Sequence, residues 1–286
     1  MSYAWYVPIT RWLEDSQLLK RIGLPDLRCV QQPGDARAKL RRKPLFHREG
    51  VSLRNVEVEW TDGQAIVRLR TLCGADDVDL GLRLVEALAH EGAEGGGERV
   101  IATGDDERLA LSELRQRHDA DWIARTRLAE LDDMAAIIGQ RSVTLGLAGP
   151  RRDFCLGPRT LARLRIHSDP RRRLERLHEL MHRVQWVDRD GDYYAATRMT
   201  ARSNGTGTQF AFTAWEPSLG YLFPRVDCLS LRNPGRFMLV AYKRLPEMAG
   251  DHMAWLDDDH ALVEKFTSDQ LPALLDRAAG CEVRIR

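Results

Sequence analysis

The sequence predicts an α+β protein, built mainly from antiparallel β-sheet with helices packed on one face. Two observations carry this expectation. Residues 56–70 alternate apolar and polar side chains on both sides of an Asp-Gly turn at 62–63, which is the pattern of a β-hairpin. Residues 76–88 then place apolar side chains at spacings of three and four, and glycines follow, which predicts a helix. Hairpins followed by helices are typical of α+β domains.

The chain has 286 residues, enough for two domains of ordinary size. We expect a first unit over residues 1–150, in which a partly helical N-terminal arm precedes the hairpin and its helix. A second α+β unit with an antiparallel sheet is expected over residues 151–286. There, an Asp-Gly turn at 190–191 predicts a second hairpin from 184–187 to 193–199. It repeats the turn and the central tryptophan of the first hairpin, which raises the hypothesis of two similar α+β halves.

The other segments alternate between short strands and helices, separated by turn-forming residues. In chain order they are a strand at 100–102, helices at 106–117 and 119–138, a strand at 142–147, helices at 158–165 and 170–184, strands at 208–215, 228–231 and 236–242, a helix at 268–279 and a closing strand at 281–285.

Composition narrows the class of protein. The 43 basic residues against 42 acidic ones give a net charge of +1, so no overall field favours nucleic acid or an anionic membrane. No apolar run reaches the roughly 18 residues of a transmembrane helix, and the N-terminus lacks the pattern of a signal peptide. The five cysteines form no C-x-x-C pair, which favours reduced thiols. We therefore expect a cytoplasmic protein without a membrane span.

Residues 178–182 read His-Glu-Leu-Met-His and match the H-E-x-x-H pattern of zinc metallohydrolases. On a helix, His178 and His182 share one face and can hold zinc while Glu179 activates a water. Arginines flank these five residues, however. In a helical projection, His178 lies at the edge of the apolar face and His182 lies outside it. We expect a surface helix with solvated histidines, no metal and no cofactor, and a zinc metallohydrolase is the alternative.

Two basic stretches, 37–43 and 171–173, and the aromatic residues Trp5, Tyr6 and Trp12 are candidates for contacts with phosphates and bases. Acidic clusters elsewhere balance them, so solvated helix faces explain the basic stretches better. The glycines at 92–97 lack the lysine of a phosphate loop. We expect neither nucleic-acid binding nor a nucleotide site, and the sequence predicts no small-molecule substrate.

The segment 253–260 places an aromatic residue beside dense negative charge. Trp255 can supply a buried anchor to a partner protein, while Asp257, Asp258 and Asp259 steer a basic partner surface toward it. These four residues are the candidate partner-binding site. The alternative interpretation is the start of a helix, where acidic residues lie near the positive end of the helix dipole.

The layout of residues 51–90 and 153–278 resembles that of uncharacterised bacterial proteins associated with toxin neutralisation. Four segments carry the resemblance: Phe154–Pro158, Val184–Val187, Tyr221–Pro224 and Trp255–Asp257. It implies an immunity protein of a polymorphic or type VI secretion toxin, which binds a cognate toxin, for example a nuclease, and covers its active surface. An enzyme activity is then not expected. A non-catalytic scaffold without a toxin partner, or a nucleic-acid-associated module, is a further alternative.

Overall fold

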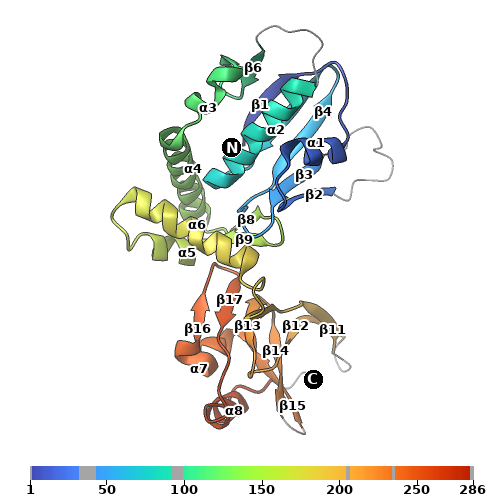
Figure 1. Ribbon diagram of the computed structural model, residues 1–286. Coiled ribbons are helices and arrows are strands. Elements are labelled where there is room, and N and C mark those ends of the chain that lie inside the picture. Colours follow the sequence, from blue (N-terminus) through green and yellow to red (C-terminus); the bar gives the residue numbers. More distant parts are fainter. Residues whose placement is uncertain (1, 32–42, 92–98, 204–206, 234–235, 284–286) are drawn as a thin grey trace. The chain divides into compact units, whose positions relative to one another are not determined.

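The computed structural model in Figure 1 describes residues 2–31, 43–91, 99–203, 207–233 and 236–283. The chain forms two compact units. The first contains residues 1–153 and 161–185, and the second contains residues 154–160 and 186–286. This division differs from the expected single boundary at 150, because residues 161–185 return to the first unit and make their contacts there.

A seven-stranded sheet organises the first unit (Figure 1), and all of its neighbouring strands are antiparallel. The expected hairpin is confirmed as β4 and β5, which pair around Gly63 in a left-handed conformation (φ 75°) that favours glycine. The strands are β1 (Tyr3–Pro8), β2 (Leu27–Gln31), β3 (Pro44–Arg48), β4 (Val56–Thr61), β5 (Gln64–Leu69), β6 (Val100–Thr103) and β7 (Arg108–Ala110), in the order β2-β3-β4-β5-β1-β6-β7.

The N-terminal segment is an inner strand of this sheet, so its interpretation as an arm is wrong. β1 lies between β5 and β6. Its alternate residues Tyr3, Trp5 and Val7 are buried, and Trp5 is 0% exposed. The segment follows the period of a strand, and its two neighbours come from sequence 60 to 100 residues away, so local reading alone could not place it at the centre of the sheet.

The helix expected after the hairpin is confirmed as α2 (Ala75–Glu91). Figure 1 shows α2 lying across one face of the sheet, with α1 (Asp15–Ile22) beside it. Gly81 permits the close approach, because a Cβ at this position would lie 2.7 Å from Cζ3 of Trp5. Helices therefore cover one face of the antiparallel sheet, as the predicted fold class requires.

The first unit continues with α4 (Ala120–Arg141), which confirms the helix predicted over 119–138. The helix predicted over 106–117 is mostly wrong, since β7 is followed there by a 3₁₀ turn (Leu111–Glu113) and the single-turn helix α3 (Leu114–Arg117). Further along are β8 (Leu145–Ala148), β9 (Asp153–Leu156) and the two predicted helices, α5 (Pro158–Leu164) and α6 (Pro170–Trp186).

The second predicted hairpin is wrong. Val184 and Trp186 are buried in the last turn of α6, where they continue the apolar face of that helix. The segment after the Asp-Gly turn is β10 (Tyr193–Ala195), which pairs in parallel with β13 (Gly220–Pro224). The helical spacing of the apolar residues therefore outweighs the local alternation at 184–187.

Two four-stranded mixed sheets form the second unit, in the orders β10-β13-β17-β16 and β11-β12-β14-β15. The unit therefore does not repeat the topology of the first, and the hypothesis of similar halves is wrong. Its remaining elements are β11 (Met199–Arg202), β12 (Gln209–Trp215), β14 (Cys228–Asn233), β15 (Arg236–Ala241), β16 (Met253–Trp255), β17 (His260–Val263), the helices α7 (Leu245–Ala249) and α8 (Leu271–Ala279), and 3₁₀ turns at Tyr242–Arg244 and Gly250–His252.

A separate apolar core holds the second unit together, with Trp215, Phe223 and Leu274 among its fully or nearly fully buried members. The predicted closing strand is reduced to a single bridge between Val240 and Glu282, and residues 284–286 lie outside the described part. All five cysteines are free thiols, as expected from their spacing.

Candidate functional site

Asp257 is a buried structural residue, so its prediction as a surface partner contact is wrong. It lies in the turn between β16 and β17, and its side chain is 0% exposed. The backbone N–H of Cys155 donates to its Oδ2 at 2.8 Å, and the backbone N–H of Asp259 donates to its Oδ1 at 2.8 Å. The imidazole Nδ1 of His260 lies 2.9 Å from Oδ2. The carboxylate thus ties the turn to β9.

Asp258 caps the first turn of α5. Its Oδ2 accepts hydrogen bonds from the backbone N–H groups of Gly157 and Thr160 and from the Thr160 hydroxyl, while Oδ1 accepts from the backbone N–H of Arg159. These donors would otherwise be unsatisfied at the helix start, and they face a negative charge at the positive end of the helix. The interpretation of 253–260 as a helix start is wrong, since these residues cap another helix from a β-hairpin turn.

The third aspartate, Asp259, is partly buried, which raises the pKa of its carboxyl. Trp255 is also partly buried, and the guanidinium of Arg159 lies over its ring at 3.9 Å from the centroid. Of the four predicted residues, Trp255 and Asp258 line the same cavity, while Asp257 and Asp259 do not. The structure therefore encloses Asp257, leaves Asp258 and Asp259 partly buried, and places Trp255 in the wall of a cavity.

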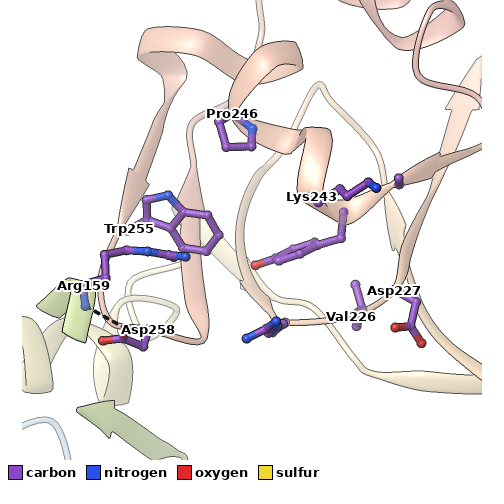
Figure 2. Close-up of a pocket in the computed structure, with 10 residues that line it drawn as sticks. Arg159, Val226, Asp227, Lys243, Pro246, Trp255 and Asp258 are labelled. Atoms are coloured by element: carbon purple, nitrogen blue, oxygen red, sulfur yellow. Dashed lines mark hydrogen bonds between the residues drawn. The ribbon is translucent and has the colours of Figure 1, made fainter. Parts of the chain in front are cut away.

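The cavity around Trp255 has a volume of about 500 Å³, and three cationic side chains are among the residues that line it; Figure 2 labels two of them, Arg159 and Lys243. The three come from separate segments: Arg159 from α5, Arg225 from the loop after β13, and Lys243 from the 3₁₀ turn after β15. All three are exposed. The full lining is Arg159, Arg225, Val226, Asp227, Ala241, Tyr242, Lys243, Pro246, Trp255 and Asp258.

The two carboxylates of the cavity wall are engaged by backbone donors. Oδ2 of Asp227 accepts from the backbone N–H of Ala211 at 2.7 Å, and Asp258 holds the start of α5. Among the described residues, the side chains of Arg225 and Lys243 make no ion pair or hydrogen bond. Figure 2 shows Arg159 flat against Trp255, with Lys243 across the cavity from them. The cavity thus offers cations that no carboxylate within the described ranges neutralises by direct contact.

Tyr242 adds a buried donor to this cavity. Its side chain is 5% exposed, and its hydroxyl has no hydrogen-bond partner among the described residues. Burial raises the pKa of the phenol above its ordinary value, so it stays protonated and available as a donor. A buried hydroxyl without a partner is uncommon, because it forfeits the hydrogen bond that it makes with water in the unfolded chain.

The H-E-x-x-H match lies on α6, and its two histidines differ. His178 is partly buried, its Nε2 is enclosed without a partner, and burial together with the charge of Arg127 lowers its pKa to about 4. The prediction that it is solvated is wrong. His182 is exposed, with Nε2 3.0 Å from the carbonyl oxygen of Gly50. Over the described part of the chain, no three His, Cys, Asp or Glu side chains group so as to hold a metal, so the geometry does not favour the zinc alternative.

Two of the aromatic residues considered for base stacking, Trp5 and Trp12, contact other aromatic side chains of the protein, and Trp12 stays 47% exposed. Trp5 is fully buried, and Trp12 stacks on Trp60 with ring centroids 4.7 Å apart. Residues 37–42 of the first basic stretch and the glycines at 92–97 lie outside the described residues, while Lys43 forms ion pairs with Glu57 and Glu59. These placements favour no nucleic-acid surface.

Sequence reasoning missed Arg159, Arg225, Tyr242 and Lys243. They form no motif, and each is an isolated residue in its own segment. The local signals were Trp255 and Asp258, the two predicted residues that line the cavity. Comparisons with protein-family models, with curated proteins and with solved structures found no match. Within the described ranges, no helix is both long and apolar enough to cross a membrane.

Proposed function

We propose that this chain is a cytoplasmic, non-catalytic binding protein that neutralises a partner protein, as immunity proteins of polymorphic or type VI secretion toxins do. The observation that supports a binding role is the Arg159–Trp255 stack at an open cavity with two further exposed cations. Tryptophan, tyrosine and arginine are the residues that most often carry the binding energy of protein interfaces. Tyr242 belongs to the same cavity wall.

The charge of the cavity favours an acidic partner surface. The sequence suggested a basic toxin, attracted by the three aspartates of the turn, but Asp257 is enclosed and Asp258 is saturated by donors. The exposed charges of the cavity lining are the three cations Arg159, Arg225 and Lys243 and the single carboxylate Asp227. We propose that carboxylates of the toxin meet these cations, which would steer the encounter, while the stacked tryptophan anchors the complex.

The test is binding to, and protection against, the products of neighbouring genes, with charge-reversed variants of the cavity. In the double variant Arg225→Glu, Lys243→Glu, we expect binding to weaken at least about tenfold, because like charges then face each other across the interface. Lys265→Glu is the matched control, since Lys265 is exposed in the same unit but does not line the cavity.

Tighter binding of the double variant would contradict the proposed acidic partner surface. Equal binding by wild type, the double variant and the control would show that the cavity is not part of the interface. If the protein neither binds nor protects against any neighbouring toxin, the immunity role itself is rejected.

A further inference from the structure

We infer that the Trp255 cavity is a binding site for a small molecule that carries a phosphate monoester group. The inference goes beyond the proposed function, since it concerns a ligand of the purified chain and requires no toxin. It rests on the proposed function only in using the same cavity, where a bound ligand would compete with a partner protein.

Three cations and one exposed carboxylate, Asp227, line the cavity. Arg159, Arg225 and Lys243 come from three separate segments: α5, the loop after β13 and the 3₁₀ turn after β15. Among the described residues, no carboxylate forms an ion pair with any of the three. Exposed cations repel one another when they are gathered, and a multiply charged anion would relieve that repulsion.

Arg159 is held in one orientation before any ligand arrives. Its guanidinium lies 3.9 Å from the ring centroid of Trp255, and its backbone N–H donates to Oδ1 of Asp258 at 3.1 Å. Stacking uses the face of the guanidinium and leaves its in-plane N–H donors available. A preorganised arginine loses less conformational entropy when it binds an anion.

The unsatisfied hydroxyl of Tyr242 is an independent sign of a ligand. Tyr242 lines the cavity, is nearly fully buried and has an O–H without an acceptor among the described residues. The charges of Asp259 and Asp257 act on this phenol, as do those of two cavity cations, Arg159 and Arg225. An anionic oxygen bound between them would supply the missing acceptor.

The number of donors and the size of the cavity favour a phosphate over a carboxylate. One arginine can satisfy a carboxylate through two parallel hydrogen bonds. A phosphate monoester has three terminal oxygens and can accept from more donors than a carboxylate, and two arginines, a lysine and a tyrosine line this cavity. The volume of about 500 Å³ exceeds the needs of a single carboxylate and lies in the range of small-molecule sites.

Isothermal titration calorimetry with phenyl phosphate and benzoate, at pH 7.5 and constant ionic strength, tests the inference on the purified full chain. We expect one phenyl phosphate per chain, bound at least about tenfold more tightly than benzoate, since the dianion engages more charged donors. Arg225→Gln should weaken phenyl phosphate binding by about tenfold or more, and Lys265→Gln should leave it unchanged.

Tyr242→Phe separates a ligand contact from a structural role. The hydroxyl has no partner among the described residues, so its removal should leave the melting temperature unchanged or raised while it weakens phenyl phosphate binding several-fold. Equal affinity for benzoate and phenyl phosphate would overturn the phosphate assignment. Absence of binding, or equal effects of Arg225→Gln and Lys265→Gln, would overturn the site. If phenyl phosphate does not bind but the toxin does, the proposed function stands and the ligand site is rejected. If phenyl phosphate binds but no toxin does, the ligand site stands and the proposed function is rejected.

Discussion

Asp77 shows how burial overrides the usual behaviour of a carboxyl. It is 0% exposed near the start of α2, where its Oδ2 accepts hydrogen bonds from the backbone N–H groups of Gly74 and Arg54. Its Oδ1 has no partner among the described residues. Burial raises the pKa of this carboxyl to about 6, although the backbone donors act in the opposite direction.

This raised pKa predicts a pH dependence of the free energy of unfolding. The folded state binds the proton more tightly than the unfolded state, whose pKa is the ordinary 3.8. The stabilising contribution is fully present below pH 3.8 and is lost as the pH rises through about 6. Asp77→Asn imitates the neutral form. Urea unfolding at pH 7.5 should show this variant gaining roughly 1 to 3 kcal/mol relative to wild type, and the gain should shrink at pH 5. A gain that grows on acidification would contradict the prediction.

The lowered pKa of His178 predicts the opposite pH dependence of the free energy of unfolding. Its folded-state pKa is about 4, below the ordinary value of 6.5, so the unfolded state binds the proton more tightly. Stability is therefore lost as the pH falls from 6.5 through about 4. Replacement by Gln removes the titrating ring, and the His178→Gln variant should lose less stability than wild type between pH 7 and pH 4.5. His182→Gln is the control, because His182 is exposed on the same helix. Parallel pH profiles of wild type and His178→Gln would refute the buried imidazole.

At the scale of elements, the start of α5 depends on a residue almost 100 positions later in the chain. Asp258 reaches it from the turn between β16 and β17, and it accepts three backbone N–H hydrogen bonds and one from the Thr160 hydroxyl. Local sequence at the helix start supplies Gly157 and Pro158, neither of which has a side chain that can accept a hydrogen bond from the backbone.

Asp258→Ala should therefore lower the free energy of unfolding by at least about 1 to 2 kcal/mol, the usual cost of a lost cap. Asp258→Asn keeps an acceptor oxygen and should recover part of this loss. Chemical unfolding followed by circular dichroism gives both values. If the Ala variant were as stable as wild type, the capping role would be wrong.

The elements also show which sequence patterns are decisive. The β4–β5 hairpin and the helices α2, α4 and α6 were predicted correctly, because each is coded by many neighbouring residues that agree on one period. The segment 184–187 was predicted as a strand from four residues, but Val184 and Trp186 extend the apolar face of α6. A longer helical pattern outweighs a short alternation, since it buries more apolar surface.

At the scale of the whole molecule, the chain builds two units with separate cores and different sheets. The near-neutral net charge conceals a local separation of charge in the second unit. Two aspartates of the 257–259 turn are used as acceptors for backbone N–H groups, while three cations remain exposed at the Trp255 cavity. Composition alone does not show which of these charged side chains are enclosed and which are exposed, because burial is decided by the folded chain.

The sequence by itself determined the α+β class, the first hairpin and the main helices. Hairpins and helices depend on turn residues and on the periodicity of apolar side chains over neighbouring positions. Both can be read directly from a short stretch of sequence. Only the tertiary structure decided that Asp257 is enclosed, that Asp258 is a cap, and that Arg159, Arg225, Tyr242 and Lys243 share one cavity. Those outcomes depend on segments up to about 100 positions apart, whose approach is set by packing of the cores and leaves no local pattern in the sequence.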